Sequence, residues 1–497
     1  MYPVLYSLLR ATRSSPQRFD TMLSIFSAAA LKIVDKIFGG VSDRIARAFT
    51  NWRKRNAIAP ASGYKIALLI ARLDGDTEHG SLRESIREAV RRELGDSVDI
   101  VLWPEALRID EALGADAEAV AQKTAQKWLL EKNSDLLIWG RVKSSNIVSL
   151  HFTVRGMTGP ESSSYRLNDT LDLPLQFIAD LGTAISARLM TLATLAAKMR
   201  GHYLLPLLRH TAERLQPLID RLNPRYDSDT RGNLLHTYAL VRDAIGTQGA
   251  SEGDLEQAIA AYHKTLQEWT RERVPEGWAV IQNNLGNTLS VLAGMRADKG
   301  LLDEAITSYN NALEVYTREC EPLGWANTQS NLGTAFQLLG KLGSGTKKLE
   351  ESVARYRAAL TVRTREREPL DWAMTQNNLG NTLFLLSTRE ENIKRLQESI
   401  GAFLEALQER TRDRVPFEWA QTASNLAKSL LLFAHLEGNP HRSEAAIDGL
   451  KQALAVFQEL GAERYIAETQ KALVMAEEQF AKQRGDMGST ENAPTGG

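Results

Sequence analysis

Hydrophobic and polar positions recur with one fixed period in the C-terminal half of the chain. Tryptophan returns every 47 residues, at Trp278, Trp325, Trp372 and Trp419. A proline stands three residues before each tryptophan, and an Asn-Leu pair begins six residues after it, as in Asn284-Leu285. Glycine follows that leucine in three copies and Ala427 follows it in the fourth. So many positions at one step predict a repeat architecture.

Each unit of the repeat has the pattern of two helices. Proline opens the first helix, where its missing N–H has no helical partner to lose. The first helix is predicted from Pro322 to Gly340 in one copy, and the second from about Leu301 to Glu319 in the copy before. Apolar residues three and four apart mark the buried side of each helix. We therefore predict an all-α solenoid over residues 228–484.

The unit resembles the tetratricopeptide family. Leu285-Gly286 is followed by Ala305, Tyr309 and Ala312 and then by the next proline, which is the order of that family's signature, stretched to 47 residues from the usual length of roughly 34. The Asn-Asn-Leu-Gly stretches at 283–286 and 377–380 look like the repeats of kinesin light chain. The resemblance covers about half the chain and implies stacked helix pairs whose concave groove binds a peptide or protein segment.

Short apolar runs alternate with helical patterns before the repeat. Strands are predicted at 65–71, 99–103, 136–142 and 147–155, with a fifth inside 163–173, and helices at 81–94 and 116–132. Such alternation predicts a small α/β domain. The fold class predicted for the whole chain is α+β, a small α/β domain followed by an all-α tetratricopeptide-like solenoid.

The predicted α/β domain resembles the amino-terminal α/β domains of TolB-type bacterial envelope and signalling proteins. The resemblance lies in the first strand ending near Asp74-Gly75-Asp76, and in the run from Ser134 to Val142 before an alternating strand. It implies a binding or assembly module with no catalytic residues to carry over.

Composition and charge divide the chain further. Residues 1–60 hold ten basic and three acidic side chains, a charge of +7, which leaves −8 for the rest and −1 overall. We predict a basic amphipathic helical segment at 1–60, the α/β domain at 61–174, a helical connector at 175–227, the array at 228–484 and a disordered tail at 485–497. The first segment packs on the protein itself, lies on an anionic membrane, or is a secretory signal.

The remaining composition limits the function classes. The near-zero net charge gives no argument for nucleic acid, and the single Cys320 excludes an internal disulfide. No apolar run of about 18 residues predicts a transmembrane helix. We expect a cytoplasmic protein, with peripheral membrane attachment as the alternative, and the oligomeric state stays open.

Motifs for catalysis are missing from the sequence. It has no P-loop, no His-x-x-x-His pair with glutamate and no Gly-x-Ser-x-Gly elbow. We therefore expect no enzyme, no metal and no cofactor. Asp74 and Asp76 are candidate paired carboxylates, although a strand-end turn explains them as well.

Asparagines in the middle of the first helices are the best site candidates, because asparagine is a poor helix-interior residue. By the tetratricopeptide resemblance, positions around Leu-Gly line the groove. These are Asn283, Asn284, Asn287, Ser330, Asn331, Thr334, Asn377, Asn378, Asn381, Ser424, Asn425 and Lys428. Their amides suit the main chain of an extended peptide, or they bond adjacent repeats as an internal ladder. Lys428 is the one cation among them, so a carboxylate clamp is not supported.

Two other periodic sets are expected to be structural. The tryptophans either stack on a ligand or form core between repeats, and we expect core. Arginines at 271, 318, 365 and 412 form either a basic ladder for an acidic partner or a surface salt-bridged by the acidic residue that follows each one, and we expect the second.

The sequence thus favours a protein-interaction scaffold that binds a peptide or protein segment. The alternative is a sensor whose α/β domain binds a small ligand and transmits through the array.

Overall fold

The computed structural model describes residues 65–76, 81–109, 117–143, 147–155, 170–175, 181–199, 204–437 and 440–491. The basic segment 1–60 lies outside these residues. Tyr64–Gly497 forms one compact unit, and the description that follows concerns this unit.

A five-stranded mixed sheet forms the first part of the unit. Its strands are β1 (Ile66–Arg72), β2 (Val98–Ala106), β3 (Leu136–Val142), β4 (Ile147–Val154) and β5 (Thr170–Pro174), in the spatial order β2-β1-β3-β4-β5. β1 pairs in parallel with β2 and β3, whereas β3, β4 and β5 are antiparallel. The small α/β domain expected from the alternating pattern is therefore present.

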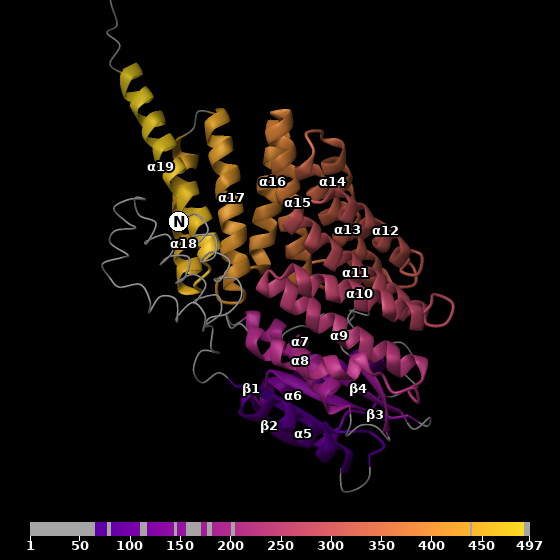
Figure 1. Ribbon diagram of the computed structural model, residues 1–497. Helices are drawn as coiled ribbons and strands as arrows, with labels where there is room; N and C mark the ends of the chain where they lie inside the picture. Colours follow the sequence, from indigo (N-terminus) through magenta and orange to yellow (C-terminus); the bar gives the residue numbers. More distant parts are fainter. Residues whose placement is uncertain are drawn as a thin grey trace, which may run out of the picture. The chain divides into compact units, whose positions relative to one another are not determined.

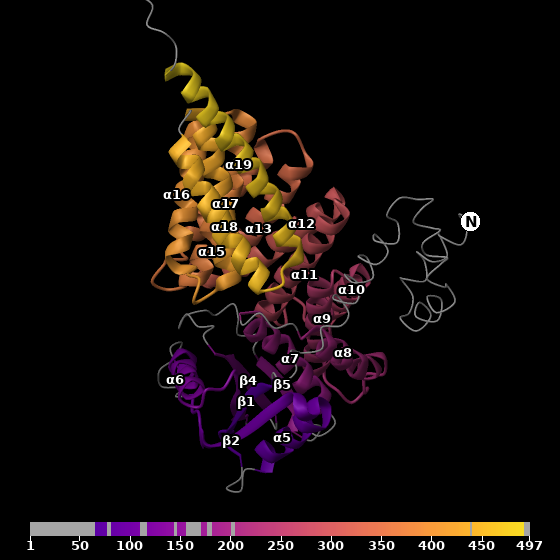
Figure 2. The same ribbon diagram turned by 90° about the vertical axis from the view of Figure 1, so that its left-hand side faces the viewer.

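Two helices cover opposite faces of this sheet, α5 (Ser81–Leu94) and α6 (Ala117–Glu131) (Figure 2). Strand side chains alternate between faces, so Leu68 and Ile138 pack with α5 while Leu69 and Leu137 pack with α6. A 3-10 turn, η1 (Gly95–Ser97), links α5 to β2.

The helices that follow stack in chain order (Figure 1). α7 (Gly182–Met199) and α8 (Leu205–Asp220) lead into the array. Its first helices are α9 (Ser228–Gly249), α11 (Pro275–Arg296), α13 (Pro322–Leu342), α15 (Pro369–Glu390), α17 (Pro416–Glu437) and α19 (Glu463–Glu491). Its second helices are α10 (Glu252–Glu268), α12 (Lys299–Leu313), α14 (Lys347–Leu360), α16 (Ile393–Glu409) and α18 (Pro440–Glu459).

Helix bounds differ from the expectation at two places. α12 ends at Leu313 and not near Glu319, so the Thr317-Arg318-Glu319 tripeptide lies in the turn before α13. α19 continues to Glu491 and so includes residues 485–491, which composition had assigned to a disordered tail.

Glycine lets the two helices of a pair approach closely. A Cβ added at Gly286 would lie 2.6 Å from the ring of Tyr309, and at Gly333 and Gly380 it would lie 2.8 Å from the rings of Tyr356 and Phe403. The fourth copy has Ala427, and there the ring is replaced by the smaller Leu450, which packs in the same cluster. Glycine and aromatic ring therefore form one matched contact.

The periodic tryptophans pack between repeats but are only partly buried. Trp325 contacts two neighbouring apolar clusters, one with Tyr316 and one with Ala359. The guanidinium groups of Arg271, Arg318 and Arg365 lie 5.9–6.0 Å from the ring centroids of Trp278, Trp325 and Trp372, a cation–π arrangement.

The salt bridges of these arginines differ from the expectation. Arg271, Arg365 and Arg412 reach Glu314, Glu409 and Glu459 at the end of the next second helix. The acidic residue adjacent to each arginine in sequence forms no ion pair with it among the described residues.

Gly333→Ala is expected to destabilise the protein by roughly 1–3 kcal/mol, because the methyl group overpacks the ring of Tyr356. Gly294→Ala is the control, since a Cβ there has nothing within 4 Å and alanine favours a helix by about 0.5–1 kcal/mol. Denaturant unfolding of both variants measures the difference. Equal stability of the two variants would contradict the proposed contact.

Candidate functional site

The candidate residues lie on α11, α13, α15 and α17, as the repeat predicts. Ser330, Asn377 and Ser424 are buried, and the other nine are half-buried. Successive first helices contact one another directly, so the candidate residues of neighbouring repeats form rows that cross from helix to helix.

Asparagine side chains bond adjacent repeats. Asn331 Nδ2 donates to Asn283 Oδ1 at 3.1 Å, and Asn425 Nδ2 donates to Asn377 Oδ1 at 3.4 Å. In both pairs the partners are 48 residues apart. The internal ladder considered for these residues is therefore formed between α11 and α13 and between α15 and α17. Between α13 and α15 a different pair forms the side-chain bond, from Gln337 Nε2 to Thr382 Oγ1 at 2.6 Å. An amide group can make up to four hydrogen bonds, so each hydrogen bond between repeats leaves other donors and acceptors of the two amides available.

A second set of polar residues lies over the glycine–aromatic contacts. The Tyr309 hydroxyl donates to Asn287 Oδ1 at 2.8 Å, and the hydroxyls of Thr334 and Tyr356 lie 2.9 Å apart. Burial raises the pKa of both tyrosines, so they stay neutral. In the next copy Phe403 has no hydroxyl, and the half-buried Asn381 side chain has no hydrogen bond to another described residue.

The side of the first helices that bears the asparagines extends beyond the expected residues. We call it the repeat face and define it by four rows. They are Val280, Asn327, Met374 and Gln421; Asn284, Asn331, Asn378 and Asn425; Asn287, Thr334, Asn381 and Lys428; and Val291, Leu338, Leu385 and Leu432. Within one helix the rows follow at i, i+4, i+7 and i+11, which is one side of an α-helix. Val280 is buried, Met374 is exposed and the others are half-buried.

Sequence reasoning missed the fourth row, although it keeps the same 47-residue step. Leucine and valine at helical spacing predict core, and the pattern alone does not distinguish a half-buried position on the asparagine side from a buried one.

The repeat face is closed at its N-terminal end by α7. Thr237 on α9 stands 47 residues before Asn284, and it accepts a hydrogen bond from Arg188 Nη2 of α7 at 2.9 Å. Arg188, His236 and Thr237 are fully buried. His236 Nε2 and Asn284 Nδ2, 3.5 Å apart, continue the ladder from α9 to α11. The accessible part of the repeat face therefore begins at α11.

Burial shifts the ionisable groups at this closed end. Desolvation, helped by the charge of Arg188, lowers the pKa of His236 well below its usual value, so this imidazole is neutral. Desolvation also raises the pKa of Asp243 to about 6, although the Thr288 hydroxyl donates to its Oδ1 at 2.7 Å.

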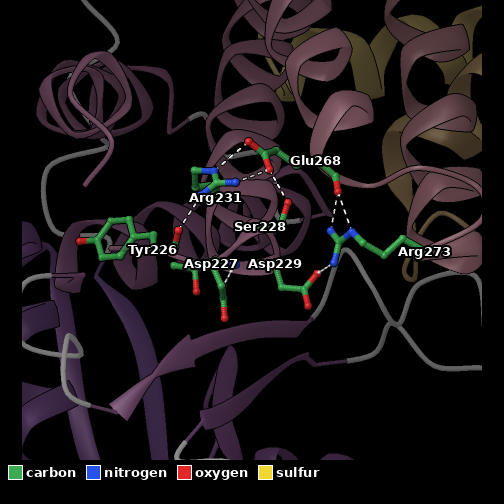
Figure 3. Close-up of polar contacts among 8 residues, drawn as sticks. Tyr226, Asp227, Ser228, Asp229, Arg231, Glu268 and Arg273 are labelled. Atoms are coloured by element: carbon green, nitrogen blue, oxygen red, sulfur yellow. Dashed lines mark hydrogen bonds and ion pairs between the residues drawn. The ribbon is translucent and has the colours of Figure 1, made fainter. Parts of the chain in front are cut away.

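A charged network joins the start of α9 to the end of α10 (Figure 3). Arg231 Nε and Nη2 donate to the two oxygens of Glu268 at 2.8 and 2.9 Å, and this lowers the pKa of Glu268. Ser228 donates to the same carboxylate, and Arg273 binds Asp229 at 2.7 Å. Arg231 and Glu268 each lie 47 residues before a residue of the next copy, Trp278 and Val315. In that copy the tryptophan and the valine pack together. The ion pair thus replaces an apolar contact and is structural.

Asp74 and Asp76 are explained by local structure. The Asp76 carboxylate accepts from the backbone N–H groups of Leu82 and Arg83 at the start of α5, both at 3.3 Å. Asp74 forms a backbone bridge with Arg141. Among the described residues, no three His, Cys, Asp or Glu side chains gather as metal ligands would.

Comparison with known proteins names no family for this chain: no protein-family model and no curated protein matches it. No helix in the described ranges combines the length and the apolar character needed to cross a membrane.

Asp243→Asn is expected to change the pH dependence of stability. The carboxyl group keeps its proton to about pH 6 when folded and to about 3.8 when unfolded. Wild type therefore loses roughly 2–3 kcal/mol relative to the variant as the pH rises from about 4 to 7. His236 shifts in the opposite direction but is present in both proteins, so its contribution cancels. Urea unfolding across this range measures the difference, and a pH-independent difference would contradict burial of a charged Asp243.

Proposed function

We propose that this chain is a protein-interaction scaffold whose repeat face binds an extended peptide segment of a partner protein. The supporting observation is the pair of polar rows, half-buried on four successive first helices, with asparagine hydrogen bonds that join α11 to α13 and α15 to α17. An extended peptide has main-chain donors and acceptors free, and an amide offers both.

The helix-pair packing supports the resemblance to tetratricopeptide proteins. The glycine–aromatic contact and the direct approach of successive first helices are what stacked helix pairs of that kind require. We propose that the array belongs with that family and that the sheet, with its TolB-like order of elements, is a second binding module.

A sensor function is the second candidate. One hydrophobic core runs without a break from Ile66 in β1 through α7 to Leu339 in α13. A ligand that shifted the sheet would therefore act on the first repeats. Native mass spectrometry of the purified chain tests this candidate, since a co-purified small molecule adds a discrete mass that denaturation removes.

Peptide binding is tested by selecting random 12-residue peptides displayed on phage against the full chain, and by calorimetry with the peptides that are enriched. Asn381→Ala is expected to weaken their binding at least tenfold, because it leaves a peptide group without its partner at a cost of about 1–3 kcal/mol. The melting temperature is expected to change little, because Asn381 bonds no other described residue.

Asn331→Ala serves as the matched variant. It breaks the rung to Asn283 and is expected to lower both affinity and melting temperature. Unchanged affinity of Asn381→Ala would remove that residue from the site, and the absence of any enriched peptide would contradict the proposed function.

A further inference from the structure

Large apolar side chains are exposed along the repeat face. Met374 is 37% exposed and belongs to its first row, and Met475 of α19, 60% exposed, stands 47 residues after Lys428. One turn beyond the fourth row lie Met295 and Leu436, 37% and 43% exposed, and the half-buried Leu342. The fourth row and these residues form an aliphatic band beside the polar rows, interrupted on α15 by Arg389. Leu338, Leu342 and Leu385 also pack on the core, and Met295 and Leu436 are the exposed members of the band. Exposed apolar surface of this kind marks interaction sites.

The spacing of this band selects the conformation of a ligand. Successive first helices contact one another, and helices in contact lie about 8–10 Å apart. A polyproline II segment has three residues per turn and rises about 3.1 Å per residue, so its side chains return to one edge every 9 Å or so. A β-strand returns to one edge after about 6.6 Å. Successive repeats thus match every third residue of a polyproline II segment.

The polar rows favour the same conformation. The main chain of a polyproline II segment makes no internal hydrogen bonds, so its N–H and C=O groups can pair with side-chain amides. The main chain of an α-helix is already paired along its length. A helical ligand would cover the polar rows without bonding them.

Charge gives the ligand an orientation. Lys428 is the one charged residue in the four rows, and it forms no ion pair with a described residue. Arg389, inside the aliphatic band, donates instead to the carbonyl oxygens of Gly340 and Gly345 at 2.8 and 2.7 Å. A ligand with a carboxylate near α17 therefore complements Lys428.

We propose, building on the proposed function, that the ligand is a polyproline II segment with an aliphatic side chain at every third position and an acidic residue at the end that lies on α17. Its aliphatic side chains contact the fourth row and the exposed residues beyond it. Its main chain pairs with the second and third rows.

The phage selection is repeated with three variants of the full chain. Lys428→Glu is expected to replace the acidic preference of the enriched peptides by a basic one. Leu436→Glu is expected to reduce affinity for wild-type peptides at least tenfold. Leu404→Glu is the control, because Leu404 is 51% exposed but lies on the second helix α16, away from the repeat face; its affinity is expected to stay within twofold of wild type.

Each alternative outcome has a distinct interpretation. Enriched peptides with an unchanged charge preference in Lys428→Glu, or with apolar residues spaced as on an α-helix, would overturn the inference while leaving peptide binding intact. Equal effects of Leu436→Glu and Leu404→Glu would remove the aliphatic band from the site. No enrichment on wild type would overturn the proposed function and this inference together.

Discussion

The close contact between a glycine of the first helix and a ring of the second sets the geometry of the array. At Gly286 and Gly333 the backbone lies against Tyr309 and Tyr356, and any larger residue would push the helices apart. The same contact brings the tyrosine hydroxyls up to Asn287 and Thr334. Packing between the two helices of a pair therefore also orders the third row of the repeat face, and it leaves Asn381 open where the ring lacks a hydroxyl.

The polar ladder joins these pairs to the sheet. A fully buried guanidinium is expensive to desolvate unless it is hydrogen-bonded, and Nη2 of Arg188 donates one such bond to the Thr237 hydroxyl. α7, which carries Arg188, also packs on α5 and β4. The helix that covers the sheet thus covers α9 as well, and this fixes the first repeat relative to the strands.

The sequence predicted what depends on local pattern and left open what depends on side-chain neighbours. Bounds such as Ser81–Leu94 and Leu136–Val142 followed from periodicity and agree with the structure. The partner of Asn331 did not follow, because an amide serves a ligand and a ladder equally well until the rotation of adjacent helices is known. The ion pair of Arg231 was missed because the 47-residue comparison looks for the same residue in each copy. Arg231 and Glu268 form an ion pair at the two positions where the next copy has the apolar contact of Trp278 with Val315.

Under the proposed function, departures from the repeat allow the repeat face to select one register of its ligand. Four identical repeats would bind a periodic ligand equally well after a shift by one repeat, since discrimination requires a difference in affinity between the two placements. Lys428 replaces an amide or hydroxyl in the last copy, Arg389 interrupts the aliphatic band in the third, and α7 closes the row ahead of Asn284. A one-repeat shift would move an acidic side chain from Lys428 to Asn381, so the cost of that misplacement is the loss of a charge-assisted contact.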